Sequence, residues 1–253
     1  MSLTSSPATE RRVAWRVGTV VGVQQETPRS RRITLDVPGW PGSLGGQHVD
    51  VRLTADDGYQ ASRSYSLASA GEGGVIQLAV DRLPDGEVSP YLNDVLAVGD
   101  EVEVHGPLGG WFVWQPSASA EPVRPVQLIA GGSGVVPMVS IIRTHVQAGD
   151  AAPFRMLYSI RSPADVFFRE ELAAAESAGL LSTEYVYTRE APPGSTTPAG
   201  RITRERFAAA LTPAEQEPTV YVCGATPFVE GVLNWALELG HDPKRLRAER
   251  YGG

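Results

Sequence analysis

Four consecutive residues, Arg63-Ser64-Tyr65-Ser66, combine a cation, a flat aromatic ring and two hydroxyls. The surrounding residues alternate in polarity between turn residues, which predicts a β-strand with Arg63 and Tyr65 on one face and Ser64 and Ser66 on the other. A guanidinium suits a phosphate, and a phenol ring suits a planar heteroaromatic system. A flavin nucleotide carries both parts. The alternative interpretation is a surface strand with an ion-paired arginine and a half-buried tyrosine.

A glycine-rich turn, Gly131-Gly132-Ser133-Gly134-Val135, follows an apolar segment and precedes a helical pattern. Glycines let the backbone approach a pyrophosphate, and the amides at a helix start favour an anion. The spacing is not that of the G-x-G-x-x-G fingerprint. We expect this turn to bind a nucleotide pyrophosphate, although tight strand–helix turns occur in any α/β protein.

A second turn, Cys223-Gly224, also joins an apolar strand to a helix. In an open parallel sheet, the loops after the strands line one ligand crevice. We therefore expect Cys223 and Gly224 to face the same ligand as the first turn. The alternative for Cys223 is a small buried side chain, which is the usual role of a lone cysteine.

Hydroxyls and arginines meet at two further strand ends. They are Ser159, Arg161 and Ser162 at one end, and Thr188 and Arg189 at the next. This combination suits a phosphate monoester. No aspartate or glutamate stands at these positions to bind a free ribose hydroxyl, and Asp165 is the nearest acidic candidate. The pattern therefore favours NADP over NAD. Helix capping by Ser162 and surface charge for the arginines are the alternatives.

The segment Gly86-Glu87-Val88-Ser89 leads into a short predicted helix, with Ser89 as its N-cap. Free amides and a hydroxyl at a helix start form an anion site. Further along, Trp111, Phe112 and Trp114 are expected to pack between two domains.

Composition excludes several classes of protein. The chain has 253 residues, a net charge of −7, four histidines and one cysteine. The negative charge argues against nucleic acid as the main partner. One cysteine cannot form an intrachain disulfide or, within this chain, a cysteine-ligated iron–sulfur cluster, and no metal site is indicated. No signal peptide and no membrane-spanning run are visible, so we expect a cytoplasmic location.

The hydrophobic pattern changes near the middle of the chain, from short alternating segments to strands alternating with helices. This change predicts a β + α/β fold in two domains. We expect a disordered tail over 1–10, an antiparallel Greek-key β-barrel over 11–116, a linker over 117–125 and a doubly wound parallel α/β domain over 126–253. The predicted strands of the first half are 13–25, 31–37, 47–53, 62–69, 75–81 and 101–106, with one helix at 89–96. The second half alternates strands at 125–130, 154–160, 183–187, 219–223 and 246–250 with helices at 136–147, 164–178, 203–210 and 227–239.

Four of these motifs together resemble the ferredoxin–NADP reductase superfamily, where they occur in the same order. They are the motifs that begin at Arg63, Gly86, Gly131 and Cys223. The stretch Glu249-Arg250-Tyr251 resembles the C-terminal stretch of its bacterial oxygenase-reductase branch. Many members of that branch carry a [2Fe–2S] domain. The single cysteine of this chain cannot ligate such a cluster, so electrons are expected to pass from the flavin to a separate acceptor.

The resemblance implies a role for each matched position. Arg63 would bind the flavin phosphate, Tyr65 would stack on the flavin and Ser66 would lie near its reactive nitrogen, with Ser64 in the same motif. Gly86, Val88 and Ser89 would bind the FAD pyrophosphate, and the NADP pyrophosphate would be bound by Gly131, Gly132, Ser133, Gly134 and Val135. Thr188 and Arg189, beside Arg161, would bind the 2′-phosphate. Cys223 and Gly224 would lie near the nicotinamide, and Tyr251 would cover the second flavin face.

The predicted function is an FAD-dependent NAD(P)H reductase that passes hydride to FAD, in preference to FMN, and electrons to a ferredoxin-like or oxygenase partner. A direct flavin or quinone reductase and a non-catalytic flavin-binding regulatory module are the alternatives. A basic cluster is a candidate docking face for an acidic partner, or a solvated surface. It comprises Arg11, Arg12, Arg16, Arg29, Arg31 and Arg32. The sequence leaves the oligomeric state undetermined.

Overall fold

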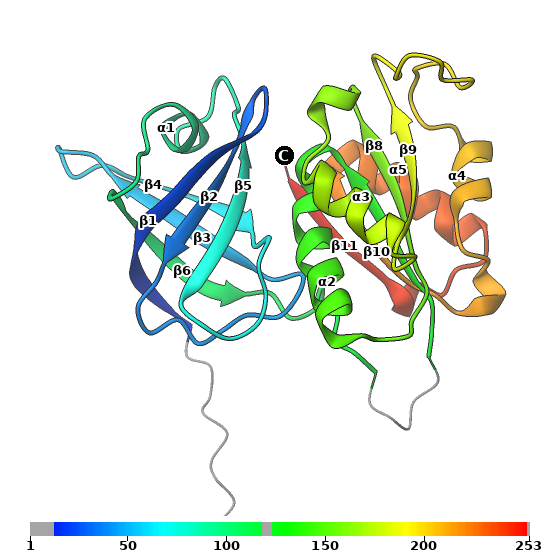
Figure 1. The fold of residues 1–253 in the computed structure, drawn as a ribbon, viewed down its shortest axis with the longest axis horizontal. Coiled ribbons are helices and arrows are strands. Elements are labelled where there is room, and N and C mark those ends of the chain that lie inside the picture. The colour runs from blue at the N-terminus through cyan, green and yellow to red at the C-terminus, as the bar shows by residue number, and fades with distance from the viewer. Residues whose placement is uncertain (1–12, 118–122, 252–253) are drawn as a thin grey trace, which may run out of the picture.

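The computed structural model describes residues 13–117 and 123–251 (Figure 1). The predicted disordered tail and residues 118–122 of the predicted linker lie outside these described residues.

The first half forms one antiparallel sheet of six strands. They are β1 (Ala14–Thr27), β2 (Ser30–Asp36), β3 (His48–Thr54), β4 (Gln60–Ser66), β5 (Val75–Asp81) and β6 (Glu101–Leu108). Their order is β4-β3-β6-β1-β2-β5, so β6 crosses to lie between β3 and β1. A bridge between Leu67 and Leu78 brings the two edge strands together into a barrel. A short helix, α1 (Ser89–Asp94), precedes β6.

The barrel strands form because apolar and polar residues alternate along them. On β3, Val49 and Val51 are fully buried, while Asp50 and Arg52 between them are partly exposed. The valines join a core that includes Leu35. This alternation, with the strand order and the bridge between the edge strands, confirms the predicted barrel.

The second half forms a parallel sheet with the order β11-β10-β7-β8-β9. Its strands are β7 (Val126–Gly131), β8 (Phe154–Ile160), β9 (Ser182–Tyr187), β10 (Thr219–Ala225) and β11 (Leu246–Tyr251). Its α-helices are α2 (Val135–Ala148), α3 (Arg169–Ser177), α4 (Arg204–Ala210) and α5 (Thr226–Glu238). Short 3-10 turns lie at Gly132–Gly134, Pro163–Asp165, Ala214–Gln216 and Pro243–Arg245.

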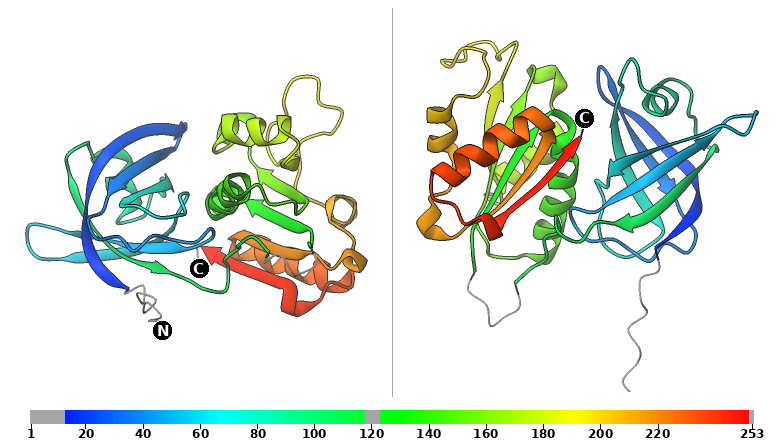
Figure 2. Two further views of the ribbon diagram at one scale, coloured as in Figure 1. Left: turned by 60° about the horizontal axis from the view of Figure 1, so that its bottom comes forward. Right: turned by 180° about the vertical axis from the view of Figure 1, so that it is seen from behind.

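Neighbouring residues of β7 face opposite sides of this sheet. Leu128 belongs to a core with Met138 of α2 and Leu172 of α3. Ile129 belongs to a separate core with Val229 of α5. Helices therefore cover both faces (Figures 1 and 2), and the predicted doubly wound α/β fold is confirmed.

Two local predictions are wrong. The helix expected over 164–178 begins only at Arg169, because Phe168 has a left-handed backbone with φ of 50°. Ser89 is not the N-cap of α1: that position is held by Val88, and the Ser89 hydroxyl instead accepts a hydrogen bond from the amide of Leu83 at 3.1 Å.

Helix α2 packs directly on the barrel turn Gly45-Gly46. A Cβ added to Gly45 would lie 2.8 Å from Thr144 Oγ1, and one added to Gly46 would lie 2.0 Å from the carbonyl oxygen of Phe112. The amide of Gly46 donates to Ser140 Oγ at 2.8 Å. Only glycines allow this approach of helix and turn.

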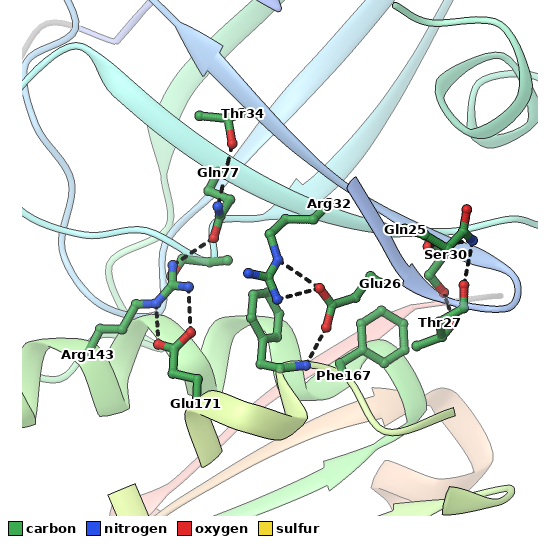
Figure 3. A network of polar contacts seen from close by, with 12 residues as sticks. Gln25, Glu26, Thr27, Ser30, Arg32, Thr34, Gln77, Arg143, Phe167 and Glu171 are labelled. Atoms are coloured by element: carbon green, nitrogen blue, oxygen red, sulfur yellow. Dashed lines mark hydrogen bonds and ion pairs between the residues drawn. The ribbon is translucent and has the colours of Figure 1, made fainter. Parts of the chain in front are cut away.

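Arg143 of α2 ties the two halves together (Figure 3). Its guanidinium donates to the carbonyl oxygen of Ala68 and to Gln77 Oε1 in the barrel half, both at 2.9 Å. It also forms two hydrogen bonds to Glu171 of α3, at 2.6 and 2.8 Å. One side chain thus links the barrel, α2 and α3.

The predicted aromatic packing between the halves holds for two of three residues. Phe112 and Trp114 are buried in the core that contains α2. Trp111 is 60% exposed and lies outside this core. The guanidinium of Arg247 lies over its ring at 5.6 Å.

The Gly46→Ala substitution should destabilise the protein more than Gly58→Ala. Both glycines have positive φ, +100° and +87°, but only an alanine at position 46 would clash with the chain, because Gly58 has no neighbour within 4 Å. We expect Gly46→Ala to cost at least about 2 kcal/mol more in urea unfolding. Equal losses for the two variants would contradict the close approach of this turn to the Phe112 carbonyl.

Candidate functional site

Four predicted segments, distant in sequence, line one cavity of about 260 Å³. The lining includes Arg63, Ser64, Tyr65, Ser66, Gly86, Val88, Ser89, Ser133 and Tyr251. They come from β4, from the turn before α1, from the glycine loop and from the end of β11. The cavity therefore lies where the two halves meet.

Two tyrosine rings approach this cavity from opposite halves. Tyr65 packs against the barrel core, and burial raises the pKa of its phenol. Tyr251 donates a hydrogen bond to the carbonyl oxygen of Gly131 at 2.6 Å, and burial raises its pKa too. Both rings are neutral at physiological pH. A cavity lined by two aromatic rings suits a flat heteroaromatic ligand.

Arg63 lies at the cavity but is not free of partners. It forms an ion pair with Glu87, whose other oxygen accepts a hydrogen bond from Tyr59 at 2.7 Å. The bonds from Tyr59 and Arg63 lower the pKa of Glu87. The alternative interpretation, an ion-paired arginine beside a half-buried tyrosine, therefore describes these side chains, but they also line a cavity. Exposed ion pairs contribute little, so an anionic ligand could compete for Arg63.

The two serines of the motif have different surroundings. Ser64 donates to Asp50 on β3 at 2.5 Å, so its hydroxyl is already bonded within the protein. Ser66 lines the cavity and lies opposite His48 in the sheet register. His48 Nδ1 lies 3.7 Å from the Glu249 carboxylate on β11, which raises the pKa of His48.

The Gly86 turn is tightly built. Gly86 donates to the carbonyl oxygen of Leu83 at 3.1 Å, and a Cβ on Gly86 would lie 2.8 Å from Ser89 Oγ. The glycine is thus required by the Ser89 hydroxyl that folds back on the turn.

A second cavity of about 310 Å³ forms a crevice between the two halves. Its lining includes Thr27, Arg29, Ser30 and Asp81 from the barrel, and Gly131, Gly132, Ser133, Arg161, Thr188, Phe167 and Tyr251 from the α/β half. Ser133 and Tyr251 also line the first cavity, so the two spaces adjoin. This is the crevice expected at the carboxyl ends of the parallel strands.

Other predicted residues support the glycine loop from below. A Cβ on Gly134 would lie 2.2 Å from the carbonyl oxygen of Cys223, and one on Gly224 would lie 2.8 Å from the Phe228 ring. Cys223 is 3% exposed and Val135 is fully buried. These four predicted residues, Gly134, Val135, Cys223 and Gly224, line none of the three cavities described in this section. Their visible role is close packing of the loop on β10.

A third cavity of about 510 Å³ collects arginines at the strand ends. Arg161, Thr188 and Arg189 line it as the sequence suggested, and Arg201 adds a third guanidinium. Asp165, the acidic candidate, accepts a hydrogen bond from Ser162 at 2.6 Å and lines the crevice instead. The cavity therefore has the donors that a phosphate monoester requires.

Sequence reasoning missed Arg201 and Glu87. Arg201 follows a loop rich in proline and glycine, where no strand pattern marks its position. Glu87 lies in the motif Gly86-Glu87-Val88-Ser89, in which only the backbone amides and the serine hydroxyl were considered as ligand contacts. Its charge, opposite to that of Arg63, was the available signal.

Two arginines of the predicted basic cluster have acidic partners within the protein. Arg32 is bonded to Glu26 at the boundary between the halves, with its guanidinium 4.3 Å from the Phe168 ring centre. Arg29 pairs with Asp81 at 3.6 Å. Arg11 and Arg12 lie outside the described residues.

Two further features bear on the class of protein. Within residues 13–117 and 123–251, no group of three or more potential metal-ligating side chains occurs. In the same part of the chain, no helix has the length and apolarity required to cross a membrane.

The barrel, the doubly wound sheet and the adjoining cavities define a two-domain nucleotide-binding architecture. Residues 19–113 match the oxidoreductase FAD-binding domain, and residues 128–234 match the oxidoreductase NAD-binding domain. The chain belongs to the ferredoxin reductase family, as its motifs indicated, with domains for FAD and NAD.

Curated relatives include two kinds of electron-transfer protein. The chain is 26% identical to the toluate 1,2-dioxygenase electron transfer component of Pseudomonas putida, covering 82% of this chain and 58% of the relative. It is 31% identical to NADH-cytochrome b5 reductase 1 of Pyricularia oryzae, covering 79% of this chain and 65% of the relative. The chain thus spans less than two thirds of either relative.

Solved structures share the whole arrangement. The FAD/NAD-binding domain of nitric oxide dioxygenase from Vibrio cholerae superposes with a TM-score of 0.81 at 26% identity, covering 96% of this chain and 100% of that one. The cytochrome P450 reductase of Amycolatopsis gives a TM-score of 0.82 at 27% identity, covering 95% and 70%.

Cys223 should be inert in the folded protein. Burial raises the pKa of its thiol, so the nucleophilic thiolate is scarce at about pH 8. We expect iodoacetamide to label Cys223 slowly in the native protein and rapidly in urea, as followed by mass spectrometry. Rapid labelling of the native protein would show that the thiol is accessible.

Proposed function

We propose that this chain is an NAD(P)H-dependent FAD reductase that delivers electrons to a separate acceptor. The observation that carries the proposal is the shared position of Tyr65 and Tyr251. They line one cavity from two domains, and that cavity adjoins the glycine-loop crevice through Tyr251 and Ser133. A flat cofactor in the first space would therefore lie next to a nucleotide in the second.

The residues of the first cavity fit a flavin nucleotide. Tyr65 and Tyr251 offer aromatic faces, Arg63 offers a cation for phosphate, and Ser66 offers a hydroxyl at the cavity wall. Glu87 must yield Arg63 to the phosphate, and its mostly exposed position makes that displacement inexpensive. When bound, FAD supplies the electron-accepting ring and NAD(P)H supplies the hydride.

The protein contributes positioning in this proposal. The loop from Gly131 to Ser133 holds the nucleotide pyrophosphate by backbone amides, and the barrel wall holds the flavin. Hydride transfer depends on near-contact geometry and needs no strong acid or base. Cys223 acts beneath the loop as a packing residue, since it is buried and largely protonated.

The third cavity favours NADPH over NADH as the donor. Arg161, Arg189 and Arg201 surround a space where Thr188 adds a hydroxyl. Several guanidiniums match a dianionic phosphate, whereas a free ribose hydroxyl is better matched by a carboxylate.

The acceptor is a separate protein in this proposal. The relative from Pseudomonas putida is named an electron transfer component of a dioxygenase, and the relative from Pyricularia oryzae a cytochrome b5 reductase. Both names describe delivery of electrons to another protein. The basic cluster, with Arg32 held at the domain boundary, gives no support for one docking face.

The purified protein should be yellow or should become yellow on reconstitution with FAD. Arg63→Ala should weaken FAD binding about ten- to a hundredfold, because a charged contact to phosphate is lost. Arg52→Ala is the matched control, since Arg52 pairs with Glu103 within the barrel. Visible absorbance and flavin fluorescence measure both effects. A protein that takes up no FAD would overturn the proposed function.

Arg189→Ala should weaken NADPH binding about ten- to a hundredfold and leave NADH binding nearly unchanged. Arg201→Ala should have the same selectivity, because Arg201 lines the same cavity. Arg204→Ala, which removes an exposed pair with Glu238 in the same domain, is the control. Anaerobic stopped-flow reduction with each nucleotide measures the difference. Equal losses for both nucleotides would refute the 2′-phosphate assignment.

A further inference from the structure

Glu26 and Arg32 of the β1–β2 hairpin form a cluster with Phe168 of the α/β domain. Figure 3 shows Glu26 and Arg32 beside the segment that contains Phe167. One carboxylate oxygen of Glu26 accepts a hydrogen bond from the backbone amide of Phe168 across the domain boundary. The other oxygen is bonded to Arg32 Nε at 2.7 Å and lies 2.5 Å from its Nη2. Glu26 is therefore oriented by its own domain and bonded to the other.

The Phe168 ring is held between cations from both domains. The guanidinium of Arg32, from the barrel, lies 4.3 Å from the ring centre. That of Arg143, from α2, lies 5.3 Å from it. The ring is 1% exposed, and cation–π contacts strengthen when water is excluded.

The backbone of Phe168 is in an unfavourable conformation. Its φ of 50° is left-handed, which is rare for a bulky residue. Such conformations persist where the surroundings impose them, and they gather at functional sites. Here the bond to Glu26 and the two cations hold Phe168 in place.

The residues next to this cluster line the nucleotide crevice. Thr27 follows Glu26, and Phe167 precedes Phe168; both lie in the wall of the crevice, on opposite sides of the domain boundary. A shift of the hairpin away from the loop would therefore widen the crevice. The hydrogen bond from Gly46 to Ser140 on α2 involves none of these residues, so the hairpin end can open without loss of that bond.

We propose that Glu26, Arg32 and Phe168 form an interdomain latch that sets the width of the nucleotide crevice, with Phe168 as a positioning residue for hydride transfer. The latch itself is a property of the chain, while its effect on hydride transfer rests on the proposed function. Domains joined by modest interfaces move relative to each other by default. The latch restricts that movement beside the crevice.

The first test uses the protein alone. Hydrogen–deuterium exchange in Glu26→Ala should rise at least about fivefold both at the hairpin tip, residues 25–31, and in the loop 161–168. Phe168→Gly, which permits the left-handed backbone but removes the buried ring, should raise exchange in the same segments. The control is Glu103→Ala, which removes a two-bond pair with Arg52 inside the barrel. Unchanged exchange at the hairpin tip in Glu26→Ala would overturn the latch.

The second test uses the flavin-loaded protein. The limiting rate of flavin reduction by NADPH should fall about ten- to a hundredfold in Glu26→Ala, because small misplacements are costly for hydride transfer. The flavin content and the Kd for NADPH should stay within about twofold. The long-wavelength charge-transfer absorbance of stacked nicotinamide and flavin should weaken. Glu26→Gln, which keeps an acceptor for the Phe168 amide, should restore most of the rate.

The outcomes separate the two proposals. If the wild-type protein binds no flavin, the proposed function fails, and the exchange experiment still decides whether the latch exists. If flavin binds and exchange rises in Glu26→Ala but the reduction rate and the charge-transfer absorbance are unchanged, the positioning role is wrong.

Discussion

The contact between α2 and the barrel turn Gly45-Gly46 places the glycine loop of the α/β half against the barrel. The helix can approach because Gly45 has no side chain beside Ser140 and Thr144, while Gly46 leaves space for the Phe112 carbonyl and donates to Ser140. The same helix begins at the glycine loop, so its docking on the barrel also places that loop beside β4 and α1. The two adjoining cavities, which are lined by residues of both halves, follow from this arrangement.

Polar contacts add to the apolar packing between the two domains. Arg143 satisfies a barrel carbonyl, a barrel amide and a carboxylate of α3 at once. Glu26 makes a comparable link at the other side of the boundary. Half-buried charges of this kind are costly when unpaired, so they favour one relative orientation of the domains. Orientation matters here because the cavity at Tyr65 and the adjoining crevice at Gly131 are each lined by residues of both domains.

The fold and the family could be predicted from the sequence because they depend on local patterns. Alternation along β3 and the glycine turn after β7 are visible without any tertiary contact. The N-cap at Ser89 and the continuous helix over 164–178 were wrong for one shared reason. In each case a contact distant in sequence or outside the helix, the Leu83 amide or the Glu26 carboxylate, overrides the local preference.

The sequence by itself determined the two domains, their order, and the residue types that suit flavin and nucleotide. Those properties follow from periodicity and from motifs of a few consecutive residues. Only the tertiary structure decided that Arg63 pairs with Glu87, that Cys223 lies beneath the loop, and that Arg201 joins Arg189. The physical reason is that burial and pairing depend on which distant segments meet, and chain folding alone brings those segments together.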